Sequence, residues 1–100
     1  MSSKEALGNI ATRLILENAR VRIWEMDLAP GASSDLHEHT TDYCMCIVAG
    51  ESIDADFVGR EPFRLPVKPG DVFFVERGGV ERAVNRSDVR FREILIELKG

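Results

Sequence analysis

The chain has 100 residues, enough for one domain with a single hydrophobic core and too few for two. Hydrophobic residues make up 44% of the sequence and charged residues 30%, a composition typical of a folded globular protein and not of a disordered one. The formal net charge of −4 argues against a broad surface for nucleic acid or anionic lipid, so we expect neither a nucleic-acid nor a membrane partner.

Eight short segments with strand-like composition follow one another along the chain. In chain order they span residues 13–17, 21–28, 43–48, 52–57, 63–67, 72–75, 81–85 and 91–98. Turn signals such as Pro30-Gly31 and Gly78-Gly79 separate them. The segment 43–48 is apolar on both faces, as expected for a strand that is covered from both sides.

The strand pattern defines the fold class. The last segment places Ile94, Ile96 and Leu98 on one face of a strand and Glu93 and Glu97 on the opposite face. Eight short strands, frequent turns and no convincing long helix argue for an all-β fold, either a β-sandwich or a closed barrel.

The cysteines and the start of the chain indicate the compartment. Residues 1–9 lack the apolar segment of a secretion signal, and no apolar run is long enough for a membrane-spanning helix. Cys44 and Cys46 alternate along one predicted strand, where their side chains run parallel, and this disfavours a disulfide between them. We expect both to be small buried apolar groups and the protein to be cytoplasmic.

The two histidines of the chain, His37 and His39, are separated by one residue. On a β-strand, residues i and i+2 face the same side, so both imidazoles would enter one space where a divalent ion could bridge them. The plainer alternative is a solvated pair on a strand surface. We favour metal binding, because imidazole is the commonest metal ligand.

Two spaced patterns surround this pair. In the first, Gly31 precedes the histidines, and Tyr43 and Gly50 follow them. It resembles glycine, five residues, His-x-His, three or four residues, glutamate, six residues and glycine, which is the first motif of the cupins, a family of small jelly-roll β-barrels. Tyr43 stands where the cupin motif has its glutamate.

The second pattern resembles the second cupin motif, which reads glycine, five residues, proline-x-glycine, two residues, histidine, three residues and asparagine. Gly70, Gly78 and Asn85 are in register with it. Glu76 stands at the proline position and Glu81 at the histidine position. The resemblance covers most of the chain and implies a small jelly-roll β-barrel.

The resemblance also implies a metal site with altered ligands. A full cupin site has three histidines and one glutamate, whereas this chain keeps His37 and His39 and has Glu81 in place of the third histidine. The implied set of two histidines and one carboxylate suits Fe(II), and also Mn, Ni or Zn. The alternative is that Glu81 points into solvent and the histidines pack as neutral imidazoles.

Regular strand pairing from residue 37 onward would place Tyr43 and Met45 inside the barrel, where they would contact a small-molecule ligand. A neutral phenol is a poor metal ligand, so we expect Tyr43 to form a hydrogen bond or to plug the cavity. As a minor variant, a bulge would turn Asp42 inward and supply a second carboxylate.

These observations predict a small cupin that binds a divalent metal and binds or acts on a small molecule, with catalytic residues unassigned. The alternative is a metal-free ligand-binding or assembly module. The sequence shows no Ser-His-acid set, no activated thiolate and no phosphate-binding loop.

We divide the chain into an N-terminal strand or arm, residues 1–17, and a single barrel domain, residues 18–100. Residues 4–12 leave two interpretations open, one helical turn or a strand exchanged with a second copy. A short barrel leaves strand edges exposed that a partner would cover, so we expect a homodimer formed through the N-terminal strands.

Overall fold

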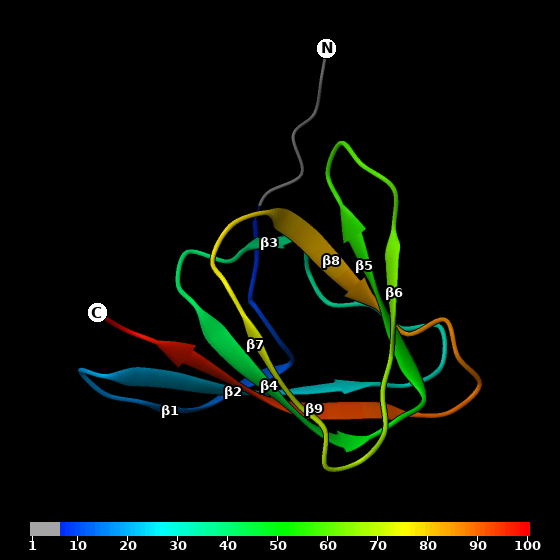
Figure 1. Cartoon of the computed structure of the whole chain (residues 1–100), viewed down its shortest axis with the longest axis horizontal. Helices are drawn as coiled ribbons and strands as arrows, with labels where there is room; N and C mark the ends of the chain where they lie inside the picture. Colours follow the sequence, from blue (N-terminus) through cyan, green and yellow to red (C-terminus); the bar gives the residue numbers. More distant parts are fainter. Residues whose placement is uncertain (1–6) are drawn as a thin grey trace.

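The computed structural model describes residues 7–100, in which nine strands form two antiparallel sheets (Figure 1). The strands are β1 (Arg13–Glu17), β2 (Val21–Leu28), β3 (His37–Glu38), β4 (Tyr43–Ala49), β5 (Ser52–Phe57), β6 (Phe63–Pro66), β7 (Val72–Val75), β8 (Val80–Val84) and β9 (Phe91–Leu98). One sheet has the order β1-β2-β9-β4-β7 and the other β3-β8-β5-β6. The two sheets form a jelly-roll-like sandwich, so the predicted all-β fold is confirmed.

The eight strands expected from the sequence all form, and their ends differ from expectation by at most one residue. The additional strand, β3, is short and begins at His37. Of residues 4–12, those at 7–12 form neither helix nor strand, and those at 4–6 lie outside the described residues. Within the described range there is no helix long and apolar enough to cross a membrane.

The core lies between the two sheets and is built from alternate residues of the strands. On β2, Trp24, Met26 and Leu28 point inward and are at most 7% exposed. On β9 the inward face is mixed, because Glu93 and Glu97 are buried there among apolar neighbours. The acid-bearing face of β9 is therefore the inner one, and its aliphatic face lies on the outside of the sheet.

The outer face of the five-stranded sheet is consequently apolar. Ile96 on β9 lies beside Cys44 on β4, which lies beside Phe74 on the edge strand β7. Both cysteines are free and half-buried on this face, so the expectation that they are buried was wrong. The reason is that β4 has a second sheet over one face only, and Cys44 and Cys46 point away from it.

Two motif residues, Gly50 and Asn85, have clear structural roles. Gly50 has a φ of +134°, and a Cβ at this position would lie 3.0 Å from the ring of Phe91. Asn85 is fully buried, and its Nδ2 donates hydrogen bonds to the carbonyls of Leu28 and Val89. Its own carbonyl accepts a hydrogen bond from the N–H of Gly31 at 2.7 Å. Asn85 therefore connects the end of β8 to the loop before β3.

Candidate metal centre

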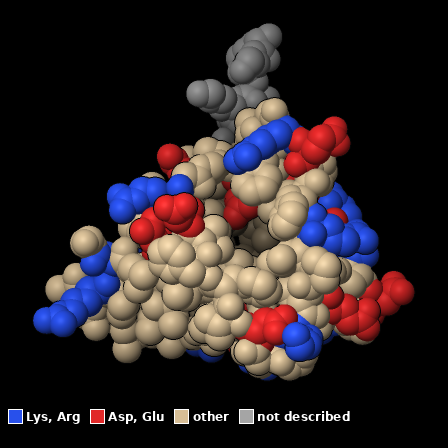
Figure 2. Space-filling view, in the orientation of Figure 1, with Lys and Arg blue, Asp and Glu red and all other residues tan. Residues whose placement is uncertain are grey.

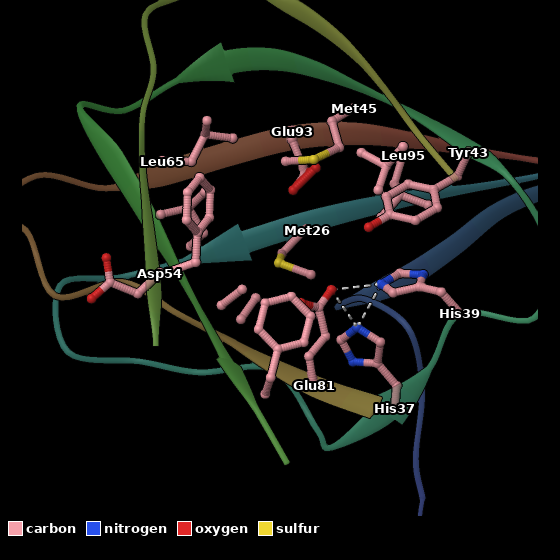
Figure 3. Close-up of a pocket in the computed structure, with 16 residues that line it drawn as sticks. Met26, His37, His39, Tyr43, Met45, Asp54, Leu65, Glu81, Glu93 and Leu95 are labelled. Atoms are coloured by element: carbon pink, nitrogen blue, oxygen red, sulfur yellow. Dashed lines mark hydrogen bonds and ion pairs between the residues drawn. The ribbon is translucent and has the colours of Figure 1, made fainter. Parts of the chain in front are cut away.

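His37, His39 and Glu81, which we call the triad, meet at one end of the space between the sheets (Figure 3). Nε2 of His37 lies 3.1 Å from Nε2 of His39, and the latter lies 2.8 Å from Oε1 of Glu81. The third separation, from Nε2 of His37 to Oε1 of Glu81, is 3.9 Å. All three side chains are buried. The structure thus brings together the three residues that the sequence selected as metal ligands.

Strand pairing and one turn place these side chains. His37 and Glu81 are directly opposite each other where β3 pairs with β8, so both point to the same face of the sheet. His39 follows β3, and its backbone is held against the turn before β8: its N–H donates to the carbonyl of Gly79, and its carbonyl accepts from Gly78. Both glycines have positive φ, which the tight turn requires.

Hydrogen bonding orients the first imidazole. Nδ1 of His37 lies 2.8 Å from the carbonyl oxygen of Asp35, so this nitrogen carries the hydrogen and donates it. The lone pair on Nε2 then faces the other two members of the triad. Burial lowers the pKa of His37, more than the hydrogen bond to Asp35 opposes it, so the imidazole is neutral at pH 7.

The triad has the donor set and the spacing of a metal site. Two ligand atoms that each lie about 2.1 Å from an ion, at right angles, are about 3.0 Å apart, close to two of the three separations seen here. The third separation is wider, and a small rotation of the Glu81 side chain would shorten it. Nδ1 of His39 is buried and has no hydrogen-bond partner among the described residues. If the hydrogen of His39 is on Nε2, the three facing atoms have one hydrogen among them, and a cation in its place would be stabilised by all three lone pairs.

A cavity of about 230 Å³ adjoins the triad and is continuous with it. Figure 2 shows the molecule hollowed near its centre, below β8 and between β7 and β6. Most of the cavity wall is apolar, with Met26, Met45, Ile53, Leu65, Val75 and Leu95 among the lining side chains. The site therefore combines a few polar groups at one end with an apolar space, as ligand pockets do.

Tyr43 and Met45, selected from the sequence as ligand contacts, both line this cavity. The ring of Tyr43 stacks on His39, with centroids 4.1 Å apart and an interplanar angle of 17°, and its hydroxyl points into the cavity (Figure 3). Burial raises the pKa of Tyr43, so it remains a neutral phenol. Contact of either residue with a ligand stays a prediction.

The minor variant with an inward Asp42 was wrong. Oδ1 of Asp42 accepts a hydrogen bond from the backbone N–H of Arg77 at 2.8 Å, and Asp42 does not line the cavity. The reason is that β4 begins at Tyr43 without a bulge at that end, so regular alternation turns Asp42 away from the interior.

Glu93 is a site residue that the sequence did not select. It lines the same cavity and is 2% exposed. The alternation of β9 places Phe91 and Leu95 on the same face as Glu93, but it does not say that this face is the inner one. A strand that buries the two apolar residues must bury the glutamate between them.

Comparison with known proteins agrees with this architecture. Residues 24–97 match the family described as the cupin domain. No curated protein sequence matches the chain.

Several solved structures have the same fold. A cupin domain from Bordetella pertussis has 22% identity and a TM-score of 0.78, with 93% of this chain and all of that chain covered. An uncharacterised double-stranded β-helix protein from Klebsiella pneumoniae has 19% identity and a TM-score of 0.71, with coverage of 96% and 84%. A cupin 2 conserved barrel protein from Salinispora arenicola has 22% identity and a TM-score of 0.67, with coverage of 97% and 82%.

At these identities the structural likeness establishes the fold alone. The family match extends over most of the chain and includes the triad and the cavity. The chain therefore belongs to the cupin family.

Proposed function

We propose that this cupin binds a divalent metal ion through the triad and receives a small molecule in the adjoining cavity. The observation that carries the proposal is the convergence of two imidazole nitrogens and one carboxylate oxygen at a buried position beside that cavity. Three protein ligands would leave coordination positions open for a small molecule. Such a set suits Fe(II), and also Mn, Ni or Zn.

A bound ion would supply Lewis-acid polarisation of a ligand oxygen, or activation of water or dioxygen. The chain's own residues perform the other tasks. Asp35 fixes the His37 tautomer through its carbonyl, and the stacked ring of Tyr43 restricts rotation of His39. The largely apolar wall lowers the local polarity, which strengthens electrostatic interactions at the triad.

Elemental analysis tests the metal site. We expect near-stoichiometric metal in protein purified without chelator, or after titration with Fe, Mn, Ni and Zn salts. His37→Ala and Glu81→Ala should each abolish this binding, because each removes one of three ligands. Glu38→Ala is the matched control, since Glu38 is exposed and lies next to His37 on β3, and it should retain the metal.

The alternative is a metal-free ligand-binding or assembly module, in which hydrogen bonds among the three triad side chains would take the place of an ion. Wild-type protein that is isolated empty and takes up none of the four metals would contradict the metal site. That result would support the alternative.

We also propose that two copies of the chain pair through β1. All five residues of β1 are exposed, and its consecutive Leu14, Ile15 and Leu16 are each about 45% exposed. β1 is the edge of its sheet, so its outer backbone groups are free to pair with a second strand. A second copy fits this edge, because antiparallel pairing of β1 with itself is isologous and covers the same leucines on both partners.

Light scattering after size-exclusion chromatography tests the pairing. We expect twice the chain mass of 11.2 kDa for the wild type and a shift toward 11.2 kDa for Leu16→Lys. Val58→Lys places the same charge at an exposed position in the turn after β5 and should leave the mass unchanged. A monomeric wild type at high concentration would contradict the pairing.

A further inference from the structure

Glu93 is a buried carboxyl group that the metal site does not use. It comes from β9 in the larger sheet, and its carboxyl group points toward the middle of the cavity (Figure 3). The side chain is 2% exposed, and Oε2 has no hydrogen-bond partner within the part of the chain that the structure describes. Figure 3 draws no hydrogen bond or ion pair from Glu93 to any of the other lining residues.

The surroundings of Glu93 are apolar. Met26 on β2 and Ile47 on β4 are its direct neighbours across the sheet, and Met45 and Leu95 line the cavity with it. Burial in this environment raises the pKa of Glu93 to about 8, and the negative charge of Glu81 contributes to the rise. At neutral pH the group is mainly an uncharged carboxylic acid, with one O–H donor and one carbonyl acceptor.

A buried polar group without a partner costs stability, which a leucine or methionine at this position would avoid. The cavity offers the one direction in which a partner for Glu93 could arrive, since the sheet closes the other sides. An acid that has no partner within the protein and faces a ligand-sized cavity is therefore a recognition group for what enters that cavity.

The size and charge of the cavity restrict that ligand. A cavity of about 150 Å³ in another protein accommodates benzene, so about 230 Å³ accommodates a six-membered ring with a few further atoms. Neither lysine nor arginine is among the described lining residues, so an anionic group would lack a partner at the Glu93 end. A cation at that end would have to lose its hydration shell among methionine and leucine side chains.

We propose that Glu93 forms a hydrogen bond with a hydroxyl or carbonyl group of an uncharged, largely apolar small molecule of about ring size. This inference rests on the proposed function only in taking the cavity as the ligand site, and it does not require a bound metal. Glu93 thereby determines which chemical class of ligand the cavity accepts, while the triad lies at the other end of the same space.

Four phenyl compounds of similar size test this ligand class: benzyl alcohol, toluene, benzylamine and benzoate. Their dissociation constants are measured by NMR titration of metal-free protein at pH 6.5, for the wild type, Glu93→Gln and Glu93→Met. We expect the wild type to bind benzyl alcohol more tightly than the other three. Glu93→Gln should retain this preference, because an amide is uncharged and both donates and accepts.

In Glu93→Met the affinity for benzyl alcohol should fall about five-fold to tenfold, while the affinity for toluene stays or rises. A second measurement needs no variant: the ¹³C resonance of the Glu93 carboxyl should shift with benzyl alcohol and not with toluene. Equal loss of both affinities in Glu93→Met, tighter binding of benzylamine or benzoate, or no binding at millimolar concentration would overturn the proposal.

Metal analysis of the same variants separates this inference from the proposed function. Glu93 is not a member of the triad, so both variants should bind metal as the wild type does. A variant that loses the preference for benzyl alcohol but still binds metal shows that Glu93 acts in ligand recognition and not in metal binding. Wild-type protein that prefers benzyl alcohol but binds no metal would contradict the proposed metal site and leave the role of Glu93 standing.

Discussion

The two glutamates on the inner face of β9 have opposite surroundings. Glu97 is 1% exposed, and its Oε1 accepts hydrogen bonds from the indole Nε1 of Trp24 and from Nε of Arg22, both at 2.7 Å. Oε2 of Glu97 and Oε2 of Glu93 both lack a partner among the described residues. Glu93, four residues earlier on the same face, has methionine and isoleucine as its neighbours across the sheet, and no hydrogen bond or ion pair joins it to the other residues that line the cavity (Figure 3).

This difference separates a structural acid from a functional one. Glu97 joins β9 to β2 through two donors to Oε1, so the burial of that oxygen is compensated within the protein. Glu93 accepts no such hydrogen bonds, and burial without them raises its pKa to about 8. Burial alone therefore does not identify a ligand-recognition group, whereas burial without a partner beside a cavity does.

The largest expected effect concerns the pH dependence of stability. Folded Glu93 keeps its proton up to about pH 8, whereas in the unfolded chain the group loses it near the ordinary glutamate pKa of 4.5. Between these values the folded state binds more protons, so stability falls as the pH rises through this window. The slope from this group is at most about 1.4 kcal/mol per pH unit, which gives about 3.5 kcal/mol between pH 5 and pH 8.

Urea unfolding of metal-free protein at several pH values measures this slope. Glu93→Gln removes the titrating group and keeps the shape of the side chain, so the difference between wild type and variant isolates Glu93 from the other carboxyl groups. Glu81 on β8 is the charged group that raises the pKa of Glu93, and it is present in both proteins. Parallel pH profiles would show that Glu93 is ionised in the folded protein.

The convergence of the triad was predictable from the sequence because two separate spacings point to it. His37 and His39 must share a face if they lie in extended chain, and Glu81 falls at a ligand position of the second motif. The fold followed from eight strand-like segments separated by turns. Both conclusions depend on local periodicity and on spacing along the chain.

The role of Glu93 was not predictable in the same way. Both faces of β9 contain apolar residues, so its alternation does not say which face is inward. The sheet has a partner sheet on one side only, and the aliphatic face with Ile94 and Ile96 lies on the other side. Which face of β9 is inward depends on its long-range pairing with β2 and β4, and the sequence of β9 alone does not determine that pairing.

The next effect comes from replacing each glutamate of β9 by leucine. Glu97→Leu should lower the free energy of unfolding by about 2–3 kcal/mol, because the buried indole N–H of Trp24 loses its acceptor. Glu93→Leu should raise it by about 1–2 kcal/mol at pH 7, because no partner is lost and apolar contact is gained. Denaturant unfolding of both variants measures the two values, and the same sign for both would contradict the comparison.

The smallest expected effect is the loss of Arg22, one of the two donors to Glu97, while the other donor, Trp24, is kept. The side chain of Arg22 is 34% exposed, so the ion pair is partly screened by solvent and is worth less than a fully buried one. Arg22→Ala should therefore cost about 0.5–1 kcal/mol, since Oε1 of Glu97 keeps its hydrogen bond from Trp24.

Arg20→Ala is the matched control for Arg22→Ala, because Arg20 is an exposed arginine just before β2, and its loss should leave the free energy of unfolding nearly unchanged. A cost for Arg22→Ala as large as that of Glu97→Leu would mean that the guanidinium, and not the indole, compensates the buried acid. In that case ionic pairing rather than hydrogen bonding would distinguish Glu97 from Glu93, and a ligand for Glu93 would need a positive charge.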